Sequence, residues 1–88
     1  MPPITLAEAK AFLRVTDDAE DGLVQLLIDA AIERVEAATG LTLTDISAAP
    51  LRLALLMLVA HGFEHRERAE APWALVEPWL ASYRTVRL

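Results

Sequence analysis

Apolar residues recur every three or four positions along most of this chain, which is the period of an α-helix. Between Val24 and Ala38 they form one stripe, and acidic or amide side chains occupy the opposite side. The same spacing returns near the N-terminus and in the second half of the chain. The pattern predicts helices from Leu6 to Arg14 or Val15, from Asp17 or Asp18 to Thr39, from Pro50 to about Arg68, and from Pro72 to about Tyr83.

Residues at the predicted helix ends match known capping preferences. Thr5 and Glu8 fit the capping box, in which each side chain binds the backbone N–H of the other residue. Gly40 stands where a left-handed residue commonly ends a helix. The second helix begins in an acidic cluster, so we expect Asp17 or Asp18 to cap it.

The segment Leu41–Ile46 is ambiguous, because its Leu-Thr-Leu-Thr alternation is typical of a strand and a lone short strand needs a partner. It either pairs with another copy or forms an extended linker. Pro50 suits the first turn of the third helix, and Pro78 is expected to interrupt or kink the fourth. Leu53–Ala60 is apolar all round, so we expect the third helix to be surrounded. The fold class is therefore all-α: one domain, residues 1–88, built as a small bundle of three to four helices with a short extended linker.

Composition points to a partner surface for this chain. Its 88 residues are 55% hydrophobic, and a domain of this mass buries only about 64% of its unfolded surface. This size argues against an enzyme with a deep cleft. The formal net charge of −5 argues against broad binding to a phosphate backbone. Cysteine is absent, and the longest apolar run has eight residues, too few for a membrane span.

One sequence motif suggests chemistry. His61-Gly62-Phe63-Glu64-His65 matches H-x-x-E-H, the inverted motif of some zinc proteases. The spacing puts both histidines on one face of a helix, but a catalytic zinc site also needs a third protein ligand. The sequence offers only scattered carboxylates for that role. We therefore expect a helix end with no metal and no cofactor.

Two charged clusters have simpler explanations than binding sites. The acidic cluster lacks the alternating ligands and central glycine of a calcium loop, and a helix N-terminus explains it. The basic residues near the C-terminus form no recognition helix, and glutamates lie between the first two of them. The acidic members are Asp17, Asp18, Glu20 and Asp21, and the basic ones are Arg66, Arg68, Arg84 and Arg87.

Four segments follow one another in a recognisable order. They are Ile4–Val15 with the acidic turn after it, Leu23–Ala31 with Glu36–Gly40, Leu55–Glu67, and Leu80–Arg84. In this order they resemble the head–tail connector (adaptor) family of tailed bacteriophages, which also occurs in prophages and gene transfer agents. The resemblance covers nearly the whole chain.

The resemblance implies a structural protein without catalysis. Such proteins form a ring, usually of twelve copies, beneath the portal protein at one capsid vertex, and they present a platform for the stopper or tail-completion proteins. The ring extends the DNA channel, and DNA passes without specific binding. The implied location is the head–tail junction of a virion or gene-transfer-agent particle, after synthesis in the host cytoplasm; no membrane is involved.

This sequence departs from the family pattern at three places. His65 replaces an asparagine, so the family pattern has no second histidine and is not a zinc motif. Gly62-Phe63 replaces an aromatic pair, and the link from Gly40 to Pro50 is shorter than in many members, where strands occupy this region.

The resemblance and the residue pattern together suggest two functional surfaces. The expected channel face is the acidic stripe of the second helix, and the aromatic last helix with its basic tail is expected to dock onto the portal. The alternative is a small helical interaction or regulatory module that forms a homodimer through the third helix. Candidate partner residues are Leu55, Leu56, Val59, Phe63, Trp73, Trp79, Tyr83, Arg84 and Arg87, and candidate channel residues are Asp29, Glu33 and Glu36.

Overall fold

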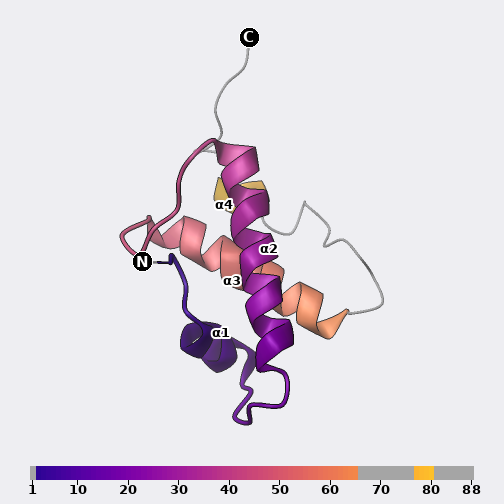
Figure 1. Ribbon diagram of the computed structural model, residues 1–88. Helices are drawn as coiled ribbons and strands as arrows, with labels where there is room; N and C mark the ends of the chain where they lie inside the picture. Colours follow the sequence, from indigo (N-terminus) through magenta and orange to yellow (C-terminus); the bar gives the residue numbers. More distant parts are fainter. Residues whose placement is uncertain (1, 66–76, 81–88) are drawn as a thin grey trace.

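A computed structural model describes residues 2–65 and 77–80, and these residues form four helices (Figure 1). They are α1 (Leu6–Leu13), α2 (Asp21–Thr39), α3 (Ala49–Glu64) and α4 (Glu77–Leu80). The described ranges contain no strand, and the prediction of an all-α bundle is confirmed.

Helix α1 begins as its sequence predicts. The Thr5 hydroxyl accepts a hydrogen bond from the Glu8 N–H at 3.1 Å, and the Glu8 carboxylate accepts one from the Thr5 N–H at 2.9 Å. This is a complete capping box, which satisfies two N–H groups that the helix leaves open. The helix ends at Arg14, whose φ of 62° places it in the left-handed region.

Helix α2 begins later than the acidic cluster predicts. Its first residue is Asp21, and neither Asp17 nor Asp18 caps it. Asp17 instead accepts a hydrogen bond from the Ala19 N–H at 3.1 Å, which forms a local turn. Asp18 pairs with Lys10 of α1. At the other end the prediction is confirmed: Gly40 has a φ of 74° and closes the helix.

The connection after α2 forms no strand with the described residues of its own chain. The Leu43 N–H donates to the Glu36 carboxylate at 2.8 Å, and the Leu43 side chain is buried in the core. Leu41, two residues earlier, is 41% exposed. The strand-like alternation therefore reflects one leucine that points inward and one that points outward along an extended linker.

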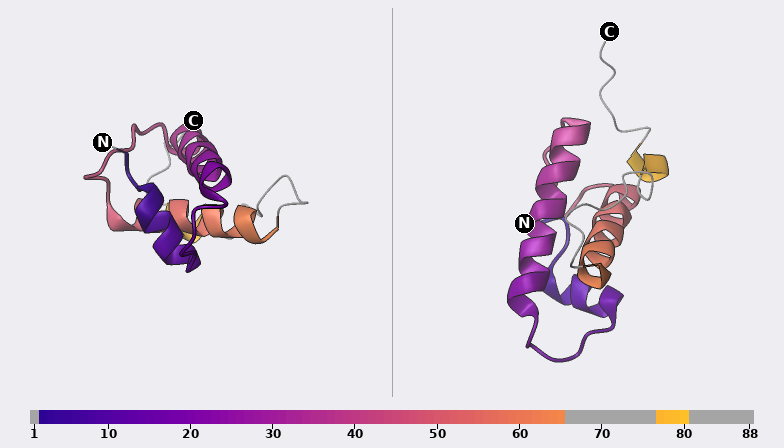
Figure 2. Two further views of the ribbon diagram at one scale, coloured as in Figure 1. Left: turned by 60° about the horizontal axis from the view of Figure 1, so that its bottom comes forward. Right: turned by 90° about the vertical axis from the view of Figure 1, so that its right-hand side faces the viewer.

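Helix α3 is the central element of the bundle, because it packs against α1, α2 and α4 (Figure 2). Its environment confirms that a helix apolar on all sides is surrounded by other elements. It ends at Glu64, four residues earlier than predicted. Pro78 lies in the first turn of α4 as the structure describes it, a position where proline is tolerated because its missing N–H has no partner in the helix. The rest of the predicted fourth helix lies outside the described residues.

The core lies between α2 and α3. The predicted stripe of α2 supplies four of its members, and the inner side of α3 supplies five. Ile4 and Leu43 close the core from the segments before α1 and after α2, and Leu80 closes it from α4. The α2 and α3 members are Val24, Ile28, Ala31, Val35, Leu51, Ala54, Leu55, Leu58 and Val59.

Candidate assembly surfaces

The structure separates the predicted partner residues into three groups. Leu55 and Val59 need a correction, since they are 0% and 1% exposed and belong to the core of this chain. Leu56 and Phe63 are half-buried and pack against that core. Trp79 is 38% exposed on α4 and remains available to a partner. The other four residues, Trp73, Tyr83, Arg84 and Arg87, lie outside the described residues.

The predicted channel residues lie on α2, but they do not form one uniform face. Asp29 and Glu33 are exposed, and Asp29 accepts a hydrogen bond from the Gln25 amide one turn earlier at 3.0 Å. Glu36 is half-buried and holds the linker through the Leu43 N–H. The acidic face is therefore reduced to Asp29 and Glu33, while Glu36 has a structural role.

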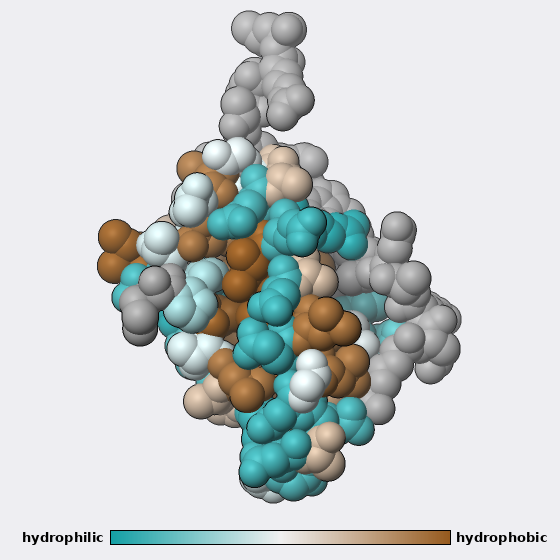
Figure 3. Space-filling model, in the orientation of Figure 1, coloured by the Kyte–Doolittle hydropathy of each residue, from teal (hydrophilic) through white to brown (hydrophobic). Residues whose placement is uncertain are grey.

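Apolar surface lies on both sides of the polar stripe that runs along α2 (Figure 3). The large exposed apolar side chains of the described residues are spread over α1, α2, the linker and α4. Phe12 is among them, although it has the same helical spacing as Leu6, Ala9 and Leu13, which are buried or half-buried. The set is Phe12 at 44%, Leu26 at 65%, Leu41 at 41%, Ile46 at 89% and Trp79 at 38% exposure.

A shallow groove of about 230 Å³ lies between the end of α1 and the second half of α3. Phe12 lines it from α1, and Met57, Ala60, His61 and Glu64 line it from α3. Its walls are mostly apolar, so water in it is readily displaced by an apolar side chain. Sequence periodicity does not predict this groove, because the groove exists only once two helices are packed.

The H-x-x-E-H motif ends α3. The two histidine rings stack with centroids 4.4 Å apart and an angle of 21° between their planes. His65 Nδ1 lies 3.1 Å from the His61 carbonyl oxygen. Among residues 2–65 and 77–80, no three His, Asp or Glu side chains are grouped so that they could hold a metal ion. The contacts of the two histidines are those of residues at the end of a helix.

Gly62 of this motif allows α2 and α3 to approach closely. A Cβ atom built on Gly62 would lie 2.8 Å from Leu27 Cδ2, which is closer than real Cβ atoms come to other atoms. The position does not need a glycine backbone conformation, because it is helical and has no positive φ. The missing side chain therefore serves helix packing.

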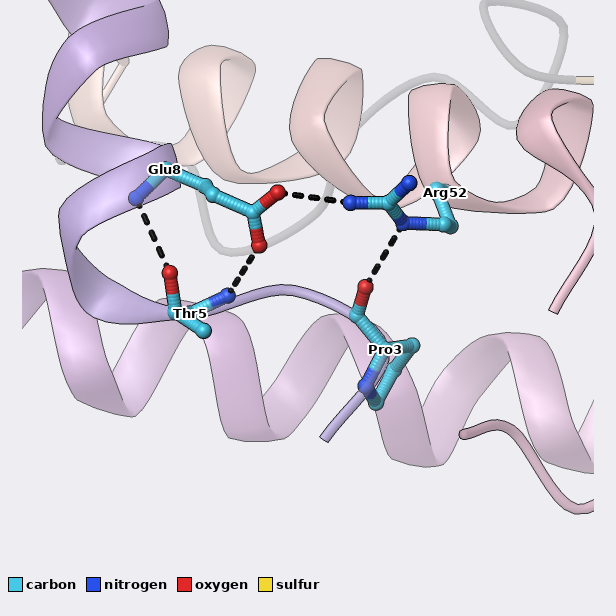
Figure 4. A network of polar contacts seen from close by, with 4 residues as sticks. All are labelled: Pro3, Thr5, Glu8 and Arg52. Carbon is cyan, nitrogen blue, oxygen red and sulfur yellow. Dashed lines mark hydrogen bonds and ion pairs between the residues drawn. The ribbon is translucent and has the colours of Figure 1, made fainter. Parts of the chain in front are cut away.

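A polar cluster joins the N-terminal segment to α3 (Figure 4). The Arg52 guanidinium donates to the Pro3 carbonyl at 2.9 Å and pairs with the Glu8 carboxylate at 2.6 Å. Glu8 in turn accepts from the Thr5 N–H, so the capping box and the ion pair share one carboxylate. Sequence reasoning found Thr5 and Glu8 but missed Arg52, a charged residue in an apolar helix.

A second polar cluster joins α1 to the start of α2. Lys10 Nζ lies 2.7 Å from the Asp18 carboxylate and 2.8 Å from that of Asp21. The hydrogen bond to Asp18, followed by that to Asp21, raises the pKa of Lys10 above its ordinary 10.5. The hydrogen bond from Lys10 lowers the pKa of Asp18 below its ordinary 3.8. The acidic cluster thus positions two helices.

The helical fold is shared with a known protein, and the sequence matches a known family. Within the described ranges, no helix is long and apolar enough to cross a bilayer. A comparison with curated proteins gives no match. The chain is similar in fold to gp6 of bacteriophage HK97, whose crystal structure it matches with a TM-score of 0.78 and 24% identity over 93% of each chain. The family profile described as "Phage gp6-like head-tail connector protein" matches residues 3–72. Because this match spans most of the sequence, the chain belongs to the phage gp6-like head-tail connector family, whose members are structural proteins and not enzymes.

Proposed function

We propose that this chain is the adaptor subunit of a ring, with about twelve copies as the resemblance implies, that joins the portal to the stopper or tail-completion proteins. The observation that carries this proposal is the family match over residues 3–72. The fold supports it, since the similarity to HK97 gp6 extends over 93% of each chain. In this role the chain acts at the head–tail junction and needs neither a cofactor nor a reaction.

The distribution of apolar surface supports assembly into a ring. In a ring each subunit meets its two neighbours through two different faces, so both faces need surface to bury. Ile46 and Phe12 come from different ends of the bundle, and both are exposed. A homodimer through α3 would need its apolar residues at the surface, whereas Leu55 and Val59 are buried inside one chain.

The acidic face of α2 supports a place on the channel wall. Carboxylates repel phosphates, so a wall carrying Asp29 and Glu33 lets DNA slide without sticking. Replacing both with lysine in the assembled ring should create DNA binding that weakens steeply with salt. Equal DNA retention by the wild-type ring and this variant would place the acidic face elsewhere.

The C-terminal segment supports docking onto the portal. Trp79 is 38% exposed on α4, and aromatic residues of this kind often anchor protein interfaces. Arg84 and Arg87 follow it in the sequence. Replacing Trp79 by serine and deleting residues 81–88 should abolish co-purification with the portal. The helical circular dichroism of the bundle should stay unchanged, because this shortened chain keeps the core residue Leu80. Undiminished portal binding by the shortened chain would remove this segment from the docking surface.

Native mass spectrometry tests the proposed function as a whole. The full chain is measured over a range of concentrations, alone and with the portal of the same particle. The proposal predicts portal-bound assemblies that carry a closed ring of chains. A tight dimer of this chain that ignores the portal would instead support the regulatory module.

A further inference from the structure

Ile46 is presented to solvent by an ordered turn. It is 89% exposed, the highest value among the large apolar side chains described. The Ser47 N–H donates to the Thr44 carbonyl at 3.0 Å, and the Thr44 N–H donates to the Ser47 hydroxyl at 2.9 Å. The Ile46 N–H donates to the Thr44 hydroxyl at 3.3 Å. The side chain is thus held outward, and little order remains to be imposed when it binds.

The groove between α1 and α3 is a suitable receptor for such a side chain. Phe12, Met57 and Ala60 give it apolar walls, and its volume of about 230 Å³ accommodates a branched aliphatic group. Phe12 is 44% exposed there, so an occupant would cover an aromatic ring that now faces water.

The turn precedes the first residue of α3 (Figure 1), whereas the α3 residues that line the groove lie in the second half of this helix. The turn precedes Ala49, and the groove is centred near His61. Twelve residues of helix separate these two positions, which corresponds to about 18 Å. Ile46 of one chain therefore cannot fill the groove of the same chain, but it can reach the groove of a neighbour.

The charges beside these two surfaces favour one docking orientation. Asp45 is exposed next to Ile46, and Arg14 is exposed two residues after Phe12, within about 8 Å of it along the chain. Neither side chain takes part in an ion pair within residues 2–65 and 77–80. Glu64 also lines the groove, from the end of α3. Attraction of Asp45 to Arg14 and its repulsion from Glu64 would together set the orientation of two docking chains.

The geometry points to a head-to-tail contact between two copies of this chain, in which Ile46 of one copy enters the α1–α3 groove of the next and Asp45 faces Arg14. This inference rests on the proposed function, because it names the contact by which neighbouring subunits join. The two surfaces are different, so the contact repeats from copy to copy and can close into a ring.

Cross-linking between single-cysteine chains tests the contact, because the natural sequence has no cysteine. The Asp45→Cys chain and the Arg14→Cys chain are mixed with a short bismaleimide, which leaves Ile46 and the groove intact. The mixture should give a covalent dimer, and neither chain alone should give one. The matched control replaces the Arg14→Cys chain by Ala37→Cys, an exposed position on α2, and should give no dimer.

Two substitutions test how much Ile46 contributes to ring assembly. Ile46→Ser should weaken ring assembly about fivefold or more, while thermal unfolding of the single chain stays unchanged because Ile46 is exposed. Leu26→Ser, a comparable change at a 65% exposed residue of α2, should leave assembly unchanged.

The possible failures are distinguishable. Rings that form without the 45–14 cross-link, or with equal cross-linking to the control position, would overturn this contact and leave the ring intact. Homodimers from either single-cysteine chain would overturn head-to-tail order. Absence of both cross-link and portal-dependent assembly would overturn the contact together with the proposed function.

Discussion

Replacing Leu55 with alanine distinguishes a core residue from an interface residue. The sequence pattern predicts Leu55 at a partner surface, whereas the structure buries it completely. If it belongs to the core, the substitution lowers the stability of the single chain. If it belongs to an interface, the single chain is unaffected and only assembly suffers.

The expected magnitude follows from burial. A buried leucine replaced by alanine costs about 2–5 kcal/mol, since transfer energy is lost and a cavity remains. A chain of 88 residues has a total stability of about 4–13 kcal/mol. Leu55→Ala therefore removes a large share of the stability. Leu26→Ala is the matched control, because Leu26 is 65% exposed and its loss should cost less than about 0.5 kcal/mol.

The assay is urea unfolding of both variants and the wild type. Circular dichroism monitors the unfolding at a protein concentration low enough to keep the chain monomeric. Stability comes from the linear dependence of the unfolding free energy on urea, and the slope reports the surface exposed. A lower midpoint for Leu55→Ala at an unchanged slope is expected. Equal midpoints for Leu55→Ala and the wild type would refute the assignment of Leu55 to the core.

Three further predictions concern particular contacts. Gly62→Ala should raise the unfolding free energy by at most about 1 kcal/mol in a Leu27→Ala background, where the added methyl group has room, and should raise it less or lower it in the wild type. Urea unfolding of the four chains measures this coupling, and equal effects of Gly62→Ala in both backgrounds would contradict it. Thr5→Ala should lower the unfolding free energy by about 0.5–2 kcal/mol, because α1 loses its N-cap. Urea unfolding measures this effect against Thr16→Ala, a control at an exposed residue outside the helices. An effect of Thr5→Ala no larger than that of the control would argue against the cap. Because the pKa of Asp18 is lowered and that of Lys10 is raised, their contribution to stability is present between about pH 3.8 and 10.5, fading as the pH falls through the lowered pKa of Asp18 or rises through the raised pKa of Lys10. The difference in Tm between the wild type and Asp18→Asn should accordingly shrink as the pH falls through the lowered pKa of Asp18, and a difference that stays the same from neutral to strongly acidic pH would be evidence against this pair.

The features predictable from the sequence are those set by short-range chemistry. The capping box of Thr5 and Glu8 and the glycine that ends α2 depend only on residues within one turn. The stripe of α2 is equally local, because polar residues on its other side mark which side faces water. In α3 no such contrast exists, so the pattern does not tell which leucines are buried.

The features that the sequence did not reveal depend on contacts between distant segments. Asp18 does not cap α2 and instead pairs with Lys10 of α1, and the Glu36 carboxylate accepts a hydrogen bond from the Leu43 N–H instead of belonging to the acidic face. Phe12 becomes exposed because α3 leaves a groove beside it. Each outcome requires the packed arrangement of two elements, which residue spacing alone does not encode.

Electron cryo-microscopy of the portal bound to this chain tests the central claim most directly. We predict a closed ring of about twelve copies on the portal, with the acidic face of α2 toward the axis and the linker of each copy at the α1–α3 groove of its neighbour. A portal that carries no ring, or isolated pairs of chains related by a twofold axis, would contradict the account.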